Sequence, residues 1–160
     1  DMKYNIRLST INDMKSVHDL IIELAIFEKE PDAVEVTVKD LEQDGFGKAP
    51  KFICFVAENE TEIVGAALIY TRYSTWKGKV LHLEDLIVKE RMRGSGLGTA
   101  LLDEVVKYGN NIGVKRICWE VLDWNASAIA FYEKKGADVK RDWDVVHLNE
   151  IGIKNYLKNI

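Results

Sequence analysis

Three glycines at alternate positions follow two arginines in the stretch RMRGSGLG, residues 91–98, which opens a helix-like pattern. The first amides of a helix have no partner within the helix, and the aligned peptide dipoles give that end about half a positive charge. The glycines let the main chain approach an anion closely, and Arg91 and Arg93 add positive charge beside it. We therefore expect this stretch to bind a phosphate or diphosphate group.

Several phosphate-binding patterns compete for this loop. A Walker loop requires a lysine after its last glycine, and here Thr99 follows Gly98. A dinucleotide loop requires a third glycine or alanine where Thr99 stands, although Glu120 has a suitable spacing for a ribose contact. The pattern R-x-x-G-x-G/A fits twice, starting from Arg91 and from Arg93. A glycine-rich turn that only connects two elements is the remaining alternative.

The run HLEDLIV, residues 82–88, contains a candidate base. Its apolar side chains occupy odd positions before Glu84 and even positions from Leu86. Such a slip of parity predicts a β-bulge at Glu84 and Asp85, which re-aims a side chain and frees main-chain amides. A carboxylate in this setting is a candidate catalytic group, and a solvated carboxylate at a strand end is the alternative.

The elements that must position these residues follow from hydrophobic period and capping residues. The middle three strands are expected to be neighbours and antiparallel. The first helix is expected to begin after Ser9 or Thr10 and to end near Pro31. Thr37 and Asp40 are expected to form an approximate capping box at the second helix, and Asn125 is expected to cap the fourth. We predict strands at residues 4–9, 51–58, 61–72, 79–89, 114–122 and 143–148, and helices at 10–31, 37–47, from 97 to an end between 109 and 113, at 125–136 and after 148.

Composition limits the classes of function. The 160 residues, 47% hydrophobic and 30% charged, are typical of one folded domain, and the net charge of −4 argues against a nucleic-acid partner. Cys54 and Cys118 lie far apart in apolar runs, and His18, His82 and His147 lack ligand spacing, so we expect buried free thiols, no metal and a cytoplasmic location. No apolar run approaches the ~20 residues of a membrane span.

The loop RMRGSGLG resembles the coenzyme A pyrophosphate loop of the GNAT acetyltransferase superfamily, and the order of elements around it resembles that fold. The blocks ELAIFEKEPDAV, LEQDGFG, YSTWKGK, HLEDLIV and VLDWNASAIAFYEKKGA resemble the diamine acetyltransferases, and YSTWKG and VLDWN are similar to their thialysine-acetylating members. The resemblance implies a single α/β (α+β) domain over residues 1–160, with a mixed, bent central sheet flanked by helices. It also implies acetyl-CoA as co-substrate and a homodimer.

The resemblance implies catalytic roles for two residues. At pH 7 the neutral form of a primary amine costs ~4.6 kcal/mol to populate, so a base must assist. Glu84 matches the glutamate that helps to deprotonate the amine, and Tyr132, which composition alone would place in a core, matches the acid for the departing thiolate. The implied cofactor-binding residues are Leu86, Ile87, Val88, Arg93, Gly94, Ser95, Gly96, Leu97, Gly98, Thr99, Asn125, Ala126, Ser127, Ala128 and Tyr132.

The substrate is expected to be a small cationic amine. Acidic residues are frequent at positions 28–44. They form either a solvated helix face or a negatively charged region that attracts a cationic substrate. Phe27 stands where polyamine-acetylating relatives have tyrosine, which argues against spermidine. Trp76 and Trp124 are candidate walls for an aliphatic stem, with structural packing as the alternative. The expected substrate-binding residues are Phe27, Glu28, Trp76, Glu84, Cys118, Trp119 and Glu120.

The sequence therefore predicts transfer of an acetyl group from acetyl-CoA to the primary amine of a thialysine-like or lysine-like amino acid, a diamine or a polyamine. Direct attack in a ternary complex is the expected route, because positioning of two bound substrates requires no covalent intermediate. A protein or peptide N-acetyltransferase and a non-catalytic coenzyme A sensor are the alternatives.

Overall fold

The computed structural model describes residues 3–160. The chain divides into two compact units, the first ending at Glu120 and the second running from Val121 to Ile160. In the described residues, no helix has the length and apolar character that a membrane crossing requires.

A five-stranded sheet forms the middle of the first unit. Its order is β1-β2-β3-β4-β5, with antiparallel pairing from β1 to β4 and parallel pairing between β4 and β5, so the expected mixed sheet is confirmed. The three middle strands are antiparallel neighbours, as predicted. The strands are β1 (Asn5–Leu8), β2 (Ile53–Glu58), β3 (Ile63–Ser74), β4 (Gly78–Val88) and β5 (Ile117–Cys118).

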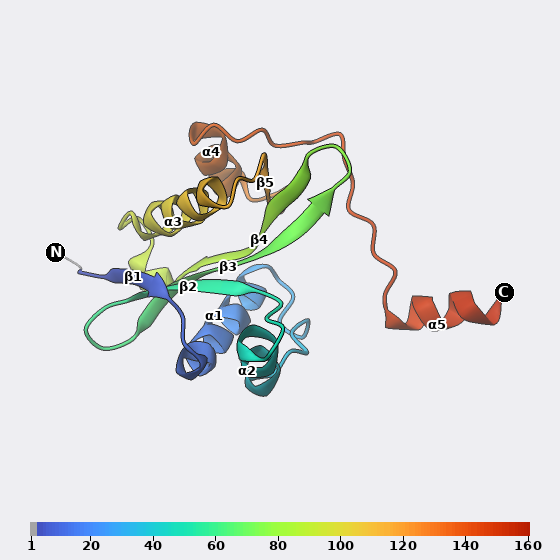
Figure 1. Cartoon of the computed structure of the whole chain (residues 1–160), viewed down its shortest axis with the longest axis horizontal. Helices are drawn as coiled ribbons and strands as arrows, with labels where there is room; N and C mark the ends of the chain where they lie inside the picture. Colours follow the sequence, from blue (N-terminus) through green and yellow to red (C-terminus); the bar gives the residue numbers. More distant parts are fainter. Residues whose placement is uncertain (1–2) are drawn as a thin grey trace. The chain divides into compact units, whose positions relative to one another are not determined.

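Helices cover both faces of this sheet. Helices α1 (Met14–Phe27) and α2 (Val38–Phe46) lie on one face and α3 (Leu97–Asn111) lies on the other (Figure 1). Two short 3-10 turns, η1 (Ile11–Asp13) and η2 (Glu90–Met92), precede α1 and α3. The core between α1, α2 and the sheet consists of Met14, Val17, Leu20, Leu41, Cys54, Val56, Ile63, Ala66, Leu68 and Ile87.

The helix termini follow local sequence signals. The Thr37 hydroxyl accepts a hydrogen bond from the Asp40 amide at 3.1 Å, and the Asp40 carboxylate accepts one from the Thr37 amide at 2.9 Å, so the predicted capping box of α2 is confirmed. Helix α1 ends earlier than predicted, at Phe27, because Lys29 adopts a left-handed conformation with φ 63°. The Lys29 amide bonds to Ile26 O, which closes the helix before Pro31.

The second unit contains α4 (Ala126–Lys134) and α5 (Glu150–Lys158). Asn125 caps α4 as predicted, since its side-chain oxygen accepts from the Ala128 amide at 3.2 Å. The strand predicted at 143–148 is wrong: these residues are exposed and in no strand of the described chain. The strand predicted at 114–122 shortens to Ile117–Cys118, because its pairing with β4 ends at Cys118. A strand needs a hydrogen-bonded neighbour, which side-chain alternation does not reveal.

Candidate functional site

The start of α3 has the backbone of an anion site. Gly94 and Gly96 have φ of 78° and 87°, in the left-handed region that side chains disfavour, and Gly96 is the N-cap residue of α3. No side chain caps this helix. The amides of its first turn therefore lack intrahelical acceptors and lie at the positive end of the helix dipole.

The two arginines of the loop have different partners. Arg91 forms an ion pair with Glu62, whose carboxylate also lies 3.0 Å from Lys89 Nζ. Arg93 is exposed, and its guanidinium carbon lies 4.9 Å from the centre of the Phe27 ring. Arg93, which is expected to bind the cofactor, thus contacts Phe27, which is expected to bind the substrate. Among the described residues Arg91 forms an ion pair and Arg93 forms none, so Arg93 is the better placed cation for an anionic ligand.

Beyond the bulge, one edge of β4 is open. Within the described chain β5 pairs with β4 only at Leu81↔Ile117 and His82↔Cys118. The continuation of β4, residues 83–88, pairs with β3 on one side and with no described strand on the other. Unpaired edge amides and carbonyls can bind an extended ligand by main-chain hydrogen bonds. This edge contains Leu86, Ile87 and Val88, which lead directly toward the glycine loop.

The predicted bulge of β4 is confirmed. Leu83 pairs with Ile69 and Asp85 pairs with Leu68, so Glu84 is the extra residue opposite no partner. The Glu84 side chain is 52% exposed, and its Oε1 lies 4.0 Å from Nε2 of His82. The bulge therefore presents a carboxylate at the point where β4 loses its β5 neighbour.

Two further carboxylates belong to the same region. Burial, and then the negative charges of Glu84 and Glu28, raise the pKa of Asp85 to about 6. Burial also raises the pKa of Glu28, which lies just past the end of α1. Glu28 and Glu84 were predicted from the sequence, whereas Asp85 was noted only as part of the bulge. Together with the exposed Glu84, these two carboxylates form a negatively charged region that attracts a cation.

Three more residues at this site were not predicted. His82 is buried, and its Nδ1 lies 3.5 Å from Nη1 of Arg72. The ring of Tyr70 lies 5.1 Å from the His82 ring, and burial and then the charge of Glu84 raise the pKa of Tyr70. The sequence did contain a signal for these residues, because two neighbouring apolar strands each contain a pair of titratable residues two positions apart. These pairs are Tyr70 and Arg72 on β3, and His82 and Glu84 on β4.

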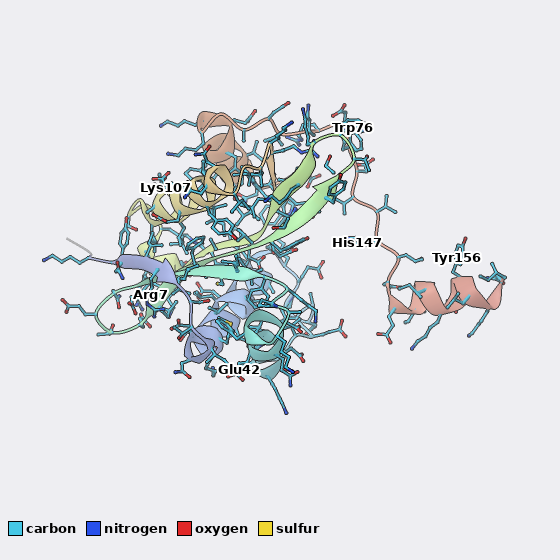
Figure 2. All side chains as sticks on the ribbon, in the orientation of Figure 1. Arg7, Glu42, Trp76, Lys107, His147 and Tyr156 are labelled. Carbon is cyan, nitrogen blue, oxygen red and sulfur yellow. The ribbon has the colours of Figure 1, made fainter. Side chains whose placement is uncertain are left out.

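Other predicted residues of the first unit have less specific settings. Trp76 is 79% exposed at the tip of the β3–β4 hairpin, so it is not a core residue (Figure 2). Cys118 and Trp119 are half-buried, and Glu120 is exposed. Cys54 is a free, buried thiol whose pKa is raised to about 12 by burial, as its apolar run predicted, whereas the free thiol of Cys118 is only partly buried.

The remaining predicted residues lie in the second unit. Tyr132 is half-buried on α4, with its ring 5.4 Å from that of Phe131. Asn125 uses its side-chain oxygen to cap α4. Ala126 and Ser127 are exposed and belong to the first turn of the same helix. The catalytic role of Tyr132 stays a prediction.

The chain is similar to known acetyltransferases in sequence. The model of the acetyltransferase (GNAT) family matches residues 15–137. Thialysine N-epsilon-acetyltransferase of Bos taurus is 38% identical over 140 residues, covering 82% of this chain and 82% of that protein. Spermidine/spermine N(1)-acetyltransferase-like protein 1 of Homo sapiens is 36% identical over 141 residues, covering 84% of this chain and 20% of that protein. An integron cassette protein from the mobile metagenome of V. cholerae shares the fold, with a TM-score of 0.80 at 20% identity and 99% of each chain covered.

Proposed function

The chain belongs to the GNAT acetyltransferase family and is an acetyl-CoA-dependent N-acetyltransferase, and we propose that it acetylates the primary amine of a small cationic substrate of the thialysine or lysine type. One observation carries the proposal: a single unit combines an uncapped, glycine-built helix start with the carboxylates of Glu28, Glu84 and Asp85, of which Glu28 and Asp85 are partly desolvated. The first feature suits a diphosphate and the second suits an ammonium group.

The residues present fit acetyl-CoA. The amides of Gly94 and of residues 96–99 are proposed to bind its diphosphate, with Arg93 turning from Phe27 toward the anion, whereas the Ser95 amide already donates to Met92 O at 3.3 Å. The open edge of β4 at residues 86–88 is proposed to bind the extended pantetheine arm through main-chain hydrogen bonds. Residues 125–128 at the start of α4 are proposed to complete this arm's binding site.

The carboxylates are proposed to bind and activate the amine. Glu28 and Asp85 attract the ammonium group, and Glu84 accepts its proton through a water molecule. The amine nitrogen then forms a bond to the acetyl carbon as the bond from that carbon to sulfur breaks, and Tyr132 donates its phenolic proton to the departing sulfur. Glu84 passes the first amine proton to solvent, and the second proton leaves the nitrogen as the amide forms and restores the phenol of Tyr132. The products are the amide, the free thiol and one proton.

Similarity to named relatives and the residue Phe27 narrow the range of candidate substrates. The relatives named thialysine N-epsilon-acetyltransferase include proteins of Bos taurus and Mus musculus, each 38% identical. Phe27 offers an apolar ring without a hydroxyl beside Glu28, which suits the thioether or methylene stem of an amino acid better than a second amine. We therefore place thialysine and lysine ahead of diamines and polyamines.

The two units are proposed to form one N-acetyltransferase domain over residues 1–160, in a cytoplasmic homodimer. The family match extends across both units, and both cysteines are free thiols, as in reducing compartments. Support for the dimer comes from apolar side chains that are exposed within the second unit, namely Trp143, Val145, Val146, Leu148, Ile151 and Tyr156. Light scattering should give twice the chain mass, and Val146→Asp should shift it toward one chain mass.

A thiol-release assay tests the proposed function. Purified protein with acetyl-CoA is offered thialysine, lysine, ornithine, putrescine, spermidine, spermine and a lysine-containing peptide. We expect the highest kcat/KM with thialysine, and Phe27→Tyr should shift the ratio of spermidine to thialysine turnover upward. Preference for the peptide would point to a protein acetyltransferase, and binding of acetyl-CoA without thiol release from any amine would point to a sensor.

A further inference from the structure

His82 is the one buried polar or charged side chain in the described residues, with 6% of its surface exposed. It lies on β4 two residues before Glu84, opposite Tyr70 of β3 and beside Cys118 of β5. Burying an imidazole is unfavourable unless its nitrogens have polar partners. Both nitrogens of His82 have one, at opposite ends of the ring.

Arg72 determines which nitrogen of His82 carries the proton. Nδ1 of His82 lies 3.5 Å from Nη1 of Arg72, and a guanidinium is always protonated and can only donate. Nδ1 must therefore accept, which places the single N–H of a neutral ring on Nε2. That nitrogen lies 4.0 Å from Oε1 of Glu84. Contacts of this kind in substrate-free active sites are commonly long and shorten when the substrate binds.

Charged groups lie around the ring on several elements. On β3, the Arg72 cation faces Nδ1 of His82. The carboxylates nearby on β4, Glu84 and Asp85, are joined by Glu28 from the end of α1. Glu120, just after β5, and Glu84 both act on the Tyr70 hydroxyl. A neutral ring that donates from Nε2 satisfies Arg72 and Glu84 together.

We propose that His82 is a positioning residue for the acetyl transfer: held as its Nε2–H tautomer by Arg72, it donates to Glu84 and keeps that carboxylate aimed at the amine. This proposal rests on the proposed role of Glu84 as base. His82 does not itself receive the substrate proton, because Arg72 occupies its accepting nitrogen and Nε2 is already protonated.

Two substitutions separate positioning from packing. His82→Phe keeps a ring against Tyr70 and removes both nitrogens, whereas His82→Gln keeps an N–H donor near the place of Nε2. We expect His82→Phe to lower kcat about tenfold, with the KM for acetyl-CoA unchanged. His82→Gln should restore most of kcat. His18→Gln is the matched control. It removes another histidine ring, on α1, whose Nε2 lies 2.7 Å from Val36 O, and it should leave kcat unchanged.

A double substitution decides whether His82 acts through Glu84. In a Glu84→Gln background, His82→Phe should cause no further loss of kcat, because the group that it positions is gone. The same tenfold loss in both backgrounds would overturn the proposal and leave a packing role. Nitrogen NMR of the imidazole gives a readout independent of turnover, and an Nδ1–H tautomer at neutral pH would also overturn it.

The failure of this inference is distinguishable from failure of the proposed function. Full activity of Glu84→Gln would remove the proposed base and with it this inference. Loss of activity in Glu84→Gln together with an unchanged kcat in His82→Phe would remove only the role of His82. Should His82→Phe not fold, His82→Gln and the NMR measurement on the unmodified protein still decide the question.

Discussion

The start of α3 and the bulge of β4 differ in what they are made of. The first presents main-chain amides around Gly96, with no capping side chain, and the second presents the carboxylates of Glu84 and Asp85. Amides do not titrate and carboxylates do. The difference predicts that acidification weakens the binding of the amine and leaves the binding of acetyl-CoA nearly unchanged.

Helix α2 begins differently from α3. The Thr37–Asp40 capping box uses two side chains to satisfy the amides of Thr37 and Asp40. Gly96 at the equivalent position of α3 has no side chain with which to do so. The backbone also differs, because Thr37 is extended with φ −97° and Gly96 is left-handed with φ 87°.

The largest expected effect is on the carboxylate side. Glu84→Gln should lower kcat several hundredfold, because an amide cannot accept the amine proton. Its dissociation constant for acetyl-CoA, measured by calorimetry, should match that of the unsubstituted protein. We expect kcat of the variant to rise with pH, because a larger fraction of the amine is then already neutral. Unchanged kcat at neutral pH would exclude Glu84 as the base.

The reciprocal change is on the amide side. Gly96→Asp should raise the dissociation constant of acetyl-CoA about a hundredfold, because the carboxylate caps the free amides and repels the diphosphate. Thr37→Asp introduces the same charge at the start of α2 and is the matched control, with an unchanged dissociation constant expected. Equal affinity of the Gly96→Asp variant would show that the diphosphate binds elsewhere.

A smaller effect is expected at Asp85. Burial, and then the charges of Glu84 and Glu28, raise its pKa to about 6, so its protonation should raise the KM for the amine as the pH falls through about 6. Asp85→Asn should have an amine KM about tenfold higher near neutral pH and a flatter pH dependence of KM. Steady-state kinetics at several pH values, with acetyl-CoA saturating, measure both.

Asp85 also links stability to pH. Its folded pKa lies above the unfolded value, so the folded state holds more protons between the two, and stability falls as the pH rises through that window. Above about pH 6, Asp85→Asn should therefore raise the free energy of unfolding by ~1–2 kcal/mol, and near pH 4 the gain should vanish. Urea unfolding at the two pH values checks the sign. A variant that is equally stabilised at both would contradict the linkage.

The smallest effect concerns the end of α1. Lys29 has φ 63°, a left-handed conformation that is unfavourable for any residue with a Cβ atom. The Glu30 amide donates to Ala25 O at 2.9 Å and closes the turn that contains Lys29. Lys29→Gly should raise the free energy of unfolding by about 0.5–1 kcal/mol while retaining the turn. Lys15→Gly within the helix is the control and should destabilise by a similar amount. Thermal unfolding distinguishes the two signs.

Local sequence signals predicted the parts of the site that lie within a few residues of one another. The glycine loop, the α2 capping box, the Asn125 cap and the slip of parity at Glu84 depend on neighbours in the chain, and each lies where it was predicted. Loops, caps and bulges are governed by dihedral preference and side-chain alternation, which a sequence displays directly.

Only the tertiary structure decided which distant residues meet. Whether residues 143–148 form a strand, and how long β5 is, depends on pairing with strands elsewhere in the chain. The strand predicted at 143–148 was wrong, and the strand predicted at 114–122 was too long. The register of β3 on β4 puts Tyr70 opposite His82, and the position of α1 brings the charge of Glu28 close enough to act on Asp85. The sequence by itself determined an amide site for an anion and a bulge with a carboxylate, because these are local. The desolvation and mutual charges that give this carboxylate region its chemistry arise only when separate elements pack together.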